Sequence, residues 1–239
     1  MNRTKKAGLS VKSGLSLMCI VCLLCGLLCG FFWLAGENSA LAAGPDGSAL
    51  AAKAVVSGDA SLAAPERDEK LAVQAAAQAL ARGELLGLPT ETVYGLAADA
   101  DNDAAVAQIF AAKGRPANHP LIVHVADAAA ITRYAKEVPV FAQQLIDAFW
   151  PGPLTLILPR LPHAAKASTG GQDSVGLRCP SHPVAHAVLQ ACQQLDPPVW
   201  GVSAPSANKF GRVSPTTAEH VASEFGEELL VLDGGACEV

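Results

Sequence analysis

The sequence has few charged residues and no surplus of basic ones. Charged side chains make up 16% of the 239 residues, and 22 Asp and Glu outnumber 17 Lys and Arg, which gives a formal net charge of -5. A protein that binds nucleic acid over a broad surface neutralises phosphates with Lys and Arg, so this balance argues against that class. Hydrophobic residues make up 51% of the chain, which is enough to bury a core.

The greater part of the chain also lacks the cysteines of a disulfide framework. Four of the seven cysteines fall within residues 19–29, and the other three are Cys179, Cys192 and Cys237. Three scattered cysteines indicate a protein of a reducing compartment. The first four have an iron–sulfur-like spacing, but they lie in an apolar run where Cys behaves as a small hydrophobic residue, so we do not interpret them as a cluster site.

Several familiar site motifs are missing. The sequence contains neither G-x-G-x-x-G nor G-x-x-x-x-G-K-[ST], the two commonest phosphate-binding loops. It contains no G-x-S-x-G, no H-E-x-x-H and no Cys/His pair at metal-binding spacing, and we assign no residue to a metal. An enzyme with this sequence is predicted to work by positioning substrates and neutralising charge, without a side-chain nucleophile.

Residues 1–64 differ in composition from the rest of the chain. Residues 14–35 carry no charge and are numerous enough to span a bilayer, and an Ala-Leu-Ala pattern follows at 40–42. We therefore expect residues 1–35 to be a membrane-inserted or cleaved segment; the alternative is a start codon assigned too far upstream. Residues 36–64 are rich in Ala, Gly, Ser and Pro and are predicted to be a flexible linker.

Short apolar strands alternate with helices over residues 65–239. This order predicts the α/β class, with a mixed twisted sheet flanked by helices. The expected helices cover residues 65–83, 102–114, 138–150, 182–194 and 216–225. The expected strands cover residues 84–88, 121–125, 154–158, 174–178, 199–203 and 228–232.

Two cations lie close together after the second predicted helix. Lys113 and Arg115 flank Gly114, and Pro116 fixes the exit of the chain. A point cation beside a planar guanidinium suits an oligophosphate, whose charge spreads over several oxygens. We expect Lys113 to face solvent; the alternative function for this residue is to complement the C-terminus of its helix.

Two further candidates end predicted strands. Arg178 follows an apolar strand, where its guanidinium could hold a ligand carboxylate or form a structural ion pair. His124 ends another strand and could touch a substrate or extend to the surface. The residue types leave both pairs of alternatives open.

Polar residues also gather in two loops that follow strands. Ser206 and Asn208 lie in a loop bounded by prolines, and Thr90, Thr92 and Tyr94 lie in the loop after the first strand. Hydroxyl and amide groups in such loops can contact phosphate or base. The alternative is that they are ordinary turn residues, which Ser, Asn and Thr often are.

Taken together, these segments resemble the YrdC/Sua5 family in their order, their spacing and their amino acids, from about Pro65 to the last residue. The family's Lys-x-Arg and Ser-x-Asn signature is matched by Lys113-Gly-Arg115 and Ser206-Ala-Asn208. Further matching stretches are Pro-Thr-Glu-Thr-Val-Tyr-Gly-Leu at 89–96, Lys-Gly-Arg-Pro at 113–116, Trp-Pro-Gly-Pro-Leu-Thr at 150–155 and Ser-Pro-Thr at 214–216. The resemblance implies a YrdC-like fold.

The resemblance also implies an activity, that of an L-threonylcarbamoyladenylate synthase. Such an enzyme joins L-threonine, bicarbonate or carbon dioxide, and ATP, with magnesium accompanying the nucleotide. Its product, threonylcarbamoyl-AMP, passes to the tRNA threonylcarbamoyl transferase complex in the cytoplasm. By the resemblance, ATP is held by Lys113, Arg115, Ser174, Ser206, Asn208 and Ser214. Threonine is held by Thr90, His124 and Arg178, and Lys113 and Arg115 offset charge on the leaving pyrophosphate.

The chain departs from the family pattern at both ends. The family continues beyond Asp233-Gly-Gly235 into a Ser-Thr-Val-Val-Asp strand and an Arg-Pro-Gly turn, and neither is present here. We therefore expect a C-terminally incomplete domain, a last strand left as an unpaired edge, and a poor synthase. The apolar leader is also foreign to the family.

Two alternative functions share the same fold. One is a module that binds double-stranded RNA or tRNA weakly, supported by Lys209 and Arg212 beside the Ser-Asn loop. The other is a carbamoyl-adenylate-forming domain like that of hydrogenase-maturation proteins.

Overall fold

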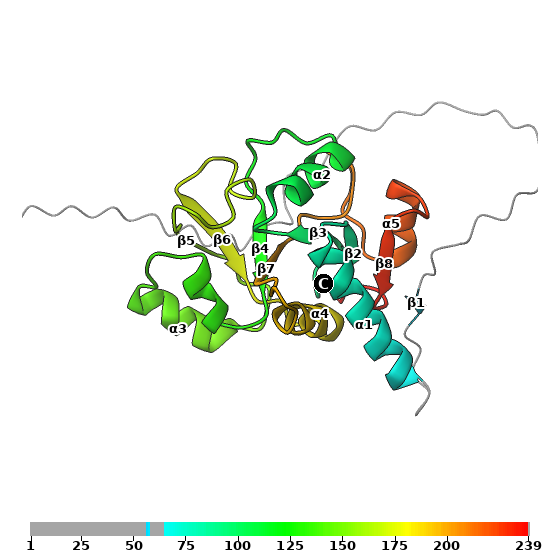
Figure 1. Cartoon of the computed structure of the whole chain (residues 1–239), viewed down its shortest axis with the longest axis horizontal. Helices are drawn as coiled ribbons and strands as arrows, with labels where there is room; N and C mark the ends of the chain where they lie inside the picture. The colour runs from blue at the N-terminus through cyan, green and yellow to red at the C-terminus, as the bar shows by residue number, and fades with distance from the viewer. Residues whose placement is uncertain (1–55, 58–64, 239) are drawn as a thin grey trace, which may run out of the picture.

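The computed structural model describes residues 56–57 and 65–238 (Figure 1). Its strands are β1 (Val56–Ser57), β2 (Leu86–Leu88), β3 (Gly95–Asp99), β4 (Ile122–Val125), β5 (Leu156–Pro159), β6 (Ser174–Arg178), β7 (Gly201–Ser203) and β8 (Leu230–Asp233). Its α-helices are α1 (Pro65–Ala81), α2 (Asp103–Lys113), α3 (Val140–Phe149), α4 (Pro183–Gln193) and α5 (Ala218–Phe225), with a short 3-10 helix, η1 (Ala129–Arg133).

All eight strands belong to one mixed sheet, in the order β1-β8-β2-β3-β7-β4-β6-β5. The pairs β1/β8, β2/β8 and β4/β6 are parallel, and the other four neighbouring pairs are antiparallel. The predicted α/β class with a mixed sheet is therefore confirmed, as are the five predicted helices and six predicted strands to within a few residues.

Local signals explain why α2 ends where it does. The Asn102 side chain accepts hydrogen bonds from the backbone N–H groups of Ala104 and Ala105, both at 3.1 Å, and so caps the N-terminus. Gly114 ends the helix in the left-handed region, at φ 63°. These two signals place Lys113 in the last turn, with its side chain beneath the loop that follows β7.

Helices pack on both faces of the sheet. On one face, α1 and α4 pack over β2, β8 and β7 through residues such as Leu88 and Val202. On the other face, α2 and α5 cover β3 and β8 through Leu96, and α3 and η1 cover β4, β5 and β6 through Val123 and Leu177. In the described part of the chain, no helix belongs to a core cluster on the α1/α4 side of β4, β6 and β5.

The structure adds one strand and corrects one expectation. Gly95–Asp99, for which no element was predicted, forms β3 in the middle of the sheet between β2 and β7. The last strand was expected to be an unpaired edge, which is wrong because β8 lies between β2 and β1. Strand β1 pairs Val56 with Leu232 and Ser57 with Asp233, and it falls in the predicted linker.

The predicted apolar segment at 14–35 lies outside the described residues, as does most of the predicted linker. Of the helices that the structure describes, none is both long enough and apolar enough to span a bilayer.

Candidate functional site

The predicted site residues of β4 and β6 lie on the α1/α4 side of the sheet, where no described helix packs over these two strands. The parallel register pairs Ile122 with Gly176 and His124 with Arg178. Side chains alternate along a strand, so these four residues and Ser174 point to the side opposite the core beneath α3. We call this surface, formed by Ile122, His124, Ser174, Gly176 and Arg178, the open sheet face.

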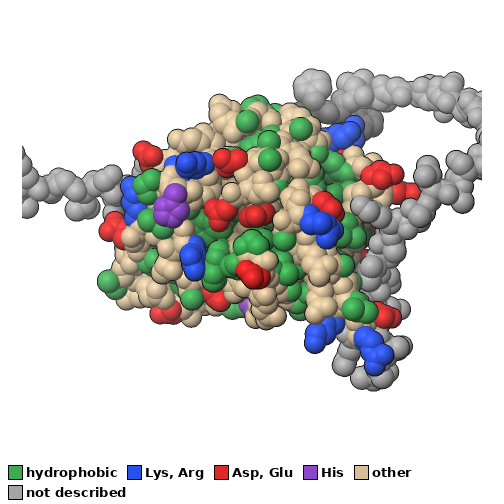
Figure 2. Space-filling view, viewed as in Figure 1, with side chains coloured by type: hydrophobic (Ala, Val, Ile, Leu, Met, Phe, Trp, Pro, Cys, Tyr) green, Lys and Arg blue, Asp and Glu red, His purple; other side chains and the backbone are tan. Residues whose placement is uncertain are grey.

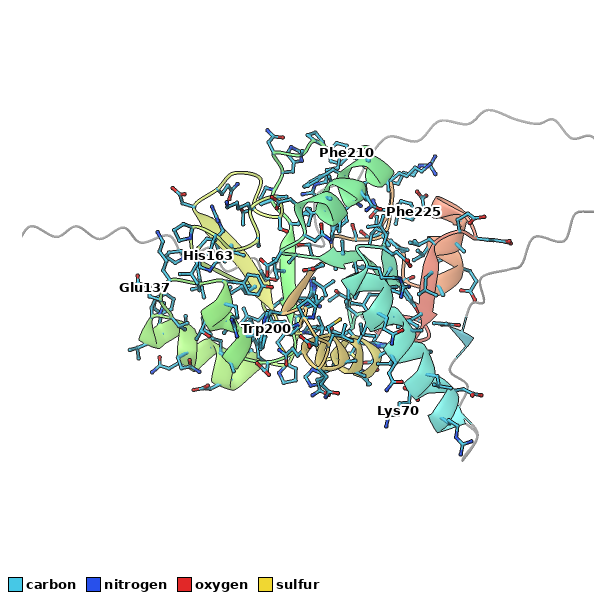
Figure 3. The ribbon with its side chains drawn as sticks, in the orientation of Figure 1. Lys70, Glu137, His163, Trp200, Phe210 and Phe225 are labelled. Atoms are coloured by element: carbon cyan, nitrogen blue, oxygen red, sulfur yellow. The ribbon has the colours of Figure 1, made fainter. Side chains whose placement is uncertain are left out.

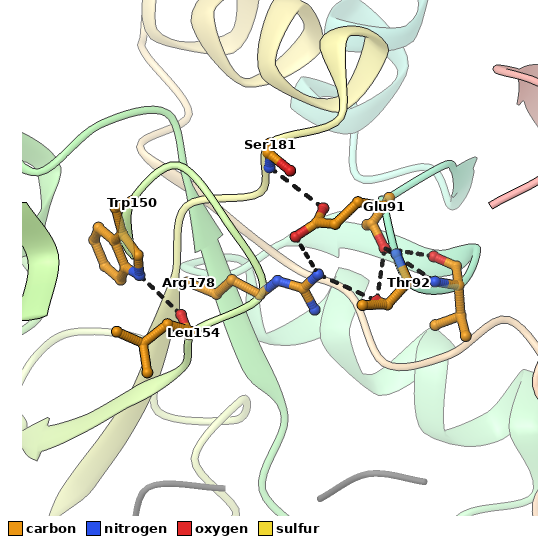
Figure 4. A network of polar contacts seen from close by, with 8 residues as sticks. Glu91, Thr92, Trp150, Leu154, Arg178 and Ser181 are labelled. Atoms are coloured by element: carbon orange, nitrogen blue, oxygen red, sulfur yellow. Dashed lines mark hydrogen bonds and ion pairs between the residues drawn. The ribbon is translucent and has the colours of Figure 1, made fainter. Parts of the chain in front are cut away.

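Arg178 is held by the loop between β2 and β3. Its Nη2 donates to Glu91 Oε1 at 2.6 Å and to Thr92 Oγ1 at 3.1 Å, and the other oxygen of Glu91 accepts from the backbone N–H of Ser181 at 3.3 Å (Figure 4). Both members of the ion pair are buried, with side chains 10% and 9% exposed. The ion pair leaves capacity for a ligand, because Arg178 Nε is buried without a partner.

His124 lies beside Arg178 and is 2% exposed, so the alternative that it extends to the surface is wrong. Burial and the neighbouring charge of Arg178 lower the pKa of His124 to about 3. The ring is therefore neutral near pH 7, and its Nδ1 has no hydrogen-bond partner. A neutral imidazole in this position can donate to or accept from a ligand.

The loop at 89–94 distinguishes its two threonines. Thr90 Oγ1 donates to the carbonyl of Val93 at 2.6 Å and accepts from the backbone N–H groups of Thr92 and Val93. That hydroxyl stabilises the turn, which is the alternative left open from sequence. The Thr92 hydroxyl contacts Thr90 Oγ1 at 3.1 Å and also accepts from Arg178, so it links Thr90 to the open sheet face.

Lys113 is buried, so the expectation that it faces solvent is wrong. The side chain is covered because the loop after β7 folds over the end of α2, where Phe210 N donates to the Lys113 carbonyl at 2.8 Å. Its Nζ donates to the carbonyls of Ser206 and Asn208, both at 2.5 Å. Burial and the charge of Arg115 lower the pKa of Lys113 to about 8. One of its three N–H donors remains for a ligand.

The other predicted nucleotide-binding residues surround this position. Arg115 Nη2 donates to the carbonyl of Pro120 at 3.1 Å, and burial lowers the pKa of Arg115. The amide nitrogen of Asn208 donates to the carbonyls of Lys209 and Arg212, which fixes the side-chain orientation. Ser214 is half-buried in the same loop. The structure thus brings the two signature motifs together at Lys113.

Buried polar atoms without partners concentrate in this region. In the described part of the chain, six buried side-chain nitrogen or oxygen atoms lack a hydrogen bond, and four belong to predicted site residues: Arg115 Nε, His124 Nδ1, Arg178 Nε and Asn208 Oδ1. The other two are the Nδ1 atoms of His182 and His186, near the start of α4. Buried polar groups are nearly always paired, so this concentration indicates a site that a polar ligand completes.

Of two hollows in the described part of the chain, the smaller touches the predicted site. The smaller, of about 90 Å³, is lined by Pro120, Leu121, Ile157, Thr169, Gln172, Ser174 and Gly176. Arg115 borders it through Pro120, and Ser174 lies about 13 Å along β6 from Arg178. The larger hollow, of about 270 Å³, contains none of the predicted ligand-binding residues and is lined mainly by the loops after β4, α3 and β6, with one turn of α3 and His186 of α4. The unpartnered polar atoms, and not the larger hollow, coincide with the predicted ligand-binding residues.

Sequence reasoning missed two features of the site. Glu91 was quoted within a motif but given no function, although it is the partner of Arg178. The rings of His119 and Phe210 contact each other at 5.8 Å between centroids, which links the loops that carry Arg115 and Asn208. Phe210 lies beside α2 at the upper edge of the molecule (Figure 3).

The sequence profile of the Sua5/YciO/YrdC family, described as "Telomere recombination", matches residues 78–239. The chain belongs to this family. Threonylcarbamoyl-AMP synthase of Pyrococcus abyssi is 43% identical over 175 residues, which cover 73% of this chain and 50% of that protein. The enzyme of the same name from Halorhodospira halophila is 38% identical over 163 residues, covering 68% and 82%.

A solved structure agrees with the family assignment. The crystal structure of P. abyssi Sua5 complexed with L-threonine superposes with a TM-score of 0.66 at 42% identity, covering 70% of this chain and 48% of that one. The expected YrdC-like fold is therefore confirmed. The chain spans about half the length of the first curated relatives that it matches in this Sua5/YciO/YrdC family.

Proposed function

We propose that the chain is an L-threonylcarbamoyladenylate synthase, which makes threonylcarbamoyl-AMP and pyrophosphate from L-threonine, bicarbonate or carbon dioxide, and ATP. The observation that carries this proposal is the set of four buried, unpartnered polar atoms in predicted site residues, two on the open sheet face and two in the loops after α2 and β7. Arg178 and His124 form one group, and Arg115 and Asn208 form another. A ligand made of an amino acid joined to a nucleotide could satisfy both groups at once.

The threonine would bind beside Arg178. The guanidinium has an unpartnered Nε, and a carboxylate is the ligand group that pairs with it most strongly. The neutral His124 ring and the Thr92 hydroxyl lie next to it and can contact the hydroxyl or amino group of threonine. The crystal structure of P. abyssi Sua5 complexed with L-threonine supports threonine as a ligand of this chain.

The nucleotide would bind at the other end. Arg115 and the remaining N–H of Lys113 would meet phosphate oxygens, and Ser174, Ser206, Asn208 and Ser214 would supply further polar contacts. These two cations would offset the negative charge that develops on the leaving pyrophosphate. Within residues 56–57 and 65–238, no three or more His, Cys, Asp or Glu side chains form a metal-binding group. Magnesium would therefore take its ligands from ATP and water.

The reaction needs no side-chain nucleophile, in agreement with the motifs that the sequence lacks. The threonine nitrogen attacks the carbon of carbon dioxide and loses a proton, which gives a carbamate; starting from bicarbonate, one water also leaves. A carbamate oxygen then attacks the α-phosphorus of ATP, and the bond to the β-phosphate oxygen breaks with release of pyrophosphate. The chain's residues would bind both substrates, hold them in line and exclude water.

The remaining partner assignments follow from this proposal. The product would pass to the tRNA threonylcarbamoyl transferase complex, in the cytoplasm. The RNA-binding alternative is less well supported, because the Arg212 side chain is paired with Glu224 at 3.0 Å. Acidic and basic side chains are also interspersed on the face shown in Figure 2, where a broad RNA surface would be mostly basic.

The decisive test is threonine-dependent release of pyrophosphate by the 239-residue chain with ATP and bicarbonate. We expect release with L-threonine, little without it, and an adenylate of the corresponding mass in the reaction. Arg115→Ala should reduce the rate while leaving the fold intact, because Arg115 is only half-buried. If neither ATP nor L-threonine binds to the folded chain in calorimetry, the proposal is wrong.

A further inference from the structure

The Arg178–Glu91 ion pair makes one end of the site electrically neutral. Arg178 is the only cationic side chain that contacts Glu91 or Thr92 in the described part of the chain. The adjacent His124 ring is uncharged near pH 7. The two thiols within electrostatic range of Glu91 are also uncharged, because burial raises the pKa of Cys179 to about 11 and raises that of Cys237. The cluster therefore carries one positive and one negative charge.

We propose that Glu91 is a specificity-determining residue, which makes this end of the site select a zwitterionic amino acid over a simple carboxylic acid. The inference rests on the proposed function, in which Arg178 faces the carboxylate of the substrate. It adds a function for Glu91, whose carboxylate would face the α-ammonium group.

Charge balance provides the first argument. Without Glu91, the site would carry a net positive charge and would attract any carboxylate. With Glu91 present, a simple carboxylate adds an uncompensated negative charge to a buried cluster, which is costly. A zwitterion adds no net charge, and each of its groups meets an opposite one. Discrimination then comes from the unfavourable placement of the wrong ligand as well as from contacts to the right one.

Geometry provides the second argument. Glu91 uses one oxygen for Arg178 and the other for a long contact, 3.3 Å, to the backbone N–H of Ser181. An ionised carboxylate offers about four acceptor positions, so two remain. Arg178 keeps its Nε free of partners. A free donor and a free acceptor thus lie side by side, as the carboxylate and ammonium of an amino acid do across one carbon.

The orientation of Glu91 is also fixed before a ligand arrives. Its side chain is 9% exposed, and it is held between Arg178 on one side and the start of α4 on the other (Figure 4). A fixed carboxylate loses little conformational freedom on binding, which favours its use in recognition. Glu91→Gln keeps the shape and one acceptor oxygen, and it removes only the charge.

The test compares two ligands that differ by the ammonium group. L-threonine and 3-hydroxybutyrate are titrated into the full chain and into Glu91→Gln by calorimetry. In the unmodified chain we expect L-threonine to bind at least about tenfold more tightly, a difference that corresponds to one uncompensated contact. In Glu91→Gln we expect the ratio to fall to about one or to invert, because the remaining charge of Arg178 favours the anion.

Two controls separate charge from structure. Glu91→Asp retains the charge, so it should retain the preference for L-threonine even where both affinities fall. Glu84→Gln removes an acid from an exposed Arg–Glu pair with Arg82 and should change neither affinity. Since the selection acts on binding, the loss in Glu91→Gln should appear as a raised KM for threonine more than as a lowered kcat.

The outcomes distinguish this inference from the proposed function. Equal affinity of the unmodified chain for both ligands would overturn the inference and leave the threonine site in place; this result does not depend on the folding of any variant. An unchanged ratio in Glu91→Gln would overturn it as well. If the unmodified chain binds neither ligand, the proposed function itself fails, and the inference fails with it.

Discussion

Lys113 shows how one residue can serve both the fold and the proposed site. Its ammonium joins the end of α2 to the loop after β7 by contacts to two carbonyl groups. The same group lies beside Arg115, where the phosphates of ATP would bind. A substitution of Lys113 therefore has two effects that must be measured separately.

Lys113→Ala is expected to lose stability as well as nucleotide binding. Removing the ammonium leaves the carbonyls of Ser206 and Asn208 without their charged donor, at a cost of about 1–3 kcal/mol. Urea unfolding monitored by circular dichroism measures this loss. Arg115→Ala is the matched control, since Arg115 is half-buried and contacts a single carbonyl, and it should weaken ATP with a smaller loss of stability. A Lys113→Ala midpoint equal to that of the unmodified chain would contradict the prediction.

The lowered pKa of Lys113 predicts opposite pH trends for stability and affinity. Between about pH 8 and 10.5 the folded chain loses this proton while the unfolded chain keeps it, so the contribution of Lys113 to the free energy of unfolding rises with pH. Over the same window its charge is lost, so the affinity for ATP should fall. Urea unfolding and ATP titrations at several pH values measure the two trends. Lys113→Arg stays charged over this window, so it should remove the fall in ATP affinity. An ATP affinity that is flat through pH 8 would argue against a contact from Lys113.

At the residue scale, the sequence predicted which residues gather but not how they pair. Arg178, His124 and the signature residues of both loops were identified by type and position. The distinction between Thr90 and Thr92 depends on the direction in which the turn closes, and it becomes visible only in the hydrogen bonds. The pairing of Glu91 with Arg178 joins residues 87 positions apart in the chain, which no local pattern encodes.

At the scale of elements, two strand glycines illustrate the difference between the covered and open faces. A Cβ at Gly201 in β7 would lie 2.6 Å from the hydroxyl oxygen of Tyr134 and 2.8 Å from Val123 Cγ1. A Cβ at Gly176 in β6 would meet nothing closer than 3.5 Å. The same substitution should therefore have different consequences on the two faces.

Gly201→Ala is expected to destabilise the domain by about 1–3 kcal/mol, because the added methyl group overpacks the core under η1. Gly176→Ala should leave the unfolding midpoint nearly unchanged and weaken ligand binding, because its methyl group enters the open sheet face. Thermal unfolding and ATP titration of both variants measure the contrast. Equal stability losses in the two variants would show that the open sheet face is packed like the other.

The helices were predicted well because their signals are local. The cap at Asn102, the stop at Gly114 and the apolar spacing of Val106, Ile109 and Phe110 lie within one stretch of sequence. Strand β3 was missed because Gly-Leu-Ala-Ala-Asp contains no β-branched or aromatic residue, and its conformation comes from pairing with β2 and β7 on either side. Strand β1 has two residues and depends wholly on β8.

At the scale of the whole molecule, the sheet serves two purposes with one set of strands. The part of its surface that helices cover supplies the core, and the open sheet face carries residues of the proposed site. The sequence predicted the α/β class and the site residues, and it did not predict which part of the sheet the helices leave uncovered. The acidic net charge, -5, agrees with recognition by a few buried cations in place of a broad basic surface.

His124→Leu is expected to raise the melting temperature and abolish threonine binding. The buried Nδ1 of His124 has no partner, and an apolar side chain of similar size removes that cost. The substitution also removes a source of acid sensitivity. In the unmodified chain, between about pH 6.5 and 3, the unfolded state takes up a proton at His124 that the folded state does not. The free energy of unfolding therefore falls as pH falls through this window. Calorimetric scans at neutral and acidic pH measure both effects. A lower melting temperature in His124→Leu would show that the ring has a structural function.

The unpartnered ring nitrogen of His124 also bears on how this protein can be engineered. It is a position where a less polar residue would make the empty chain more stable, so a screen that rewards only thermal tolerance would replace His124 first. Variants from such a screen would express well and fold well while losing the ability to bind. Any stabilisation programme for this chain should therefore hold His124 fixed and look for gains on the helices.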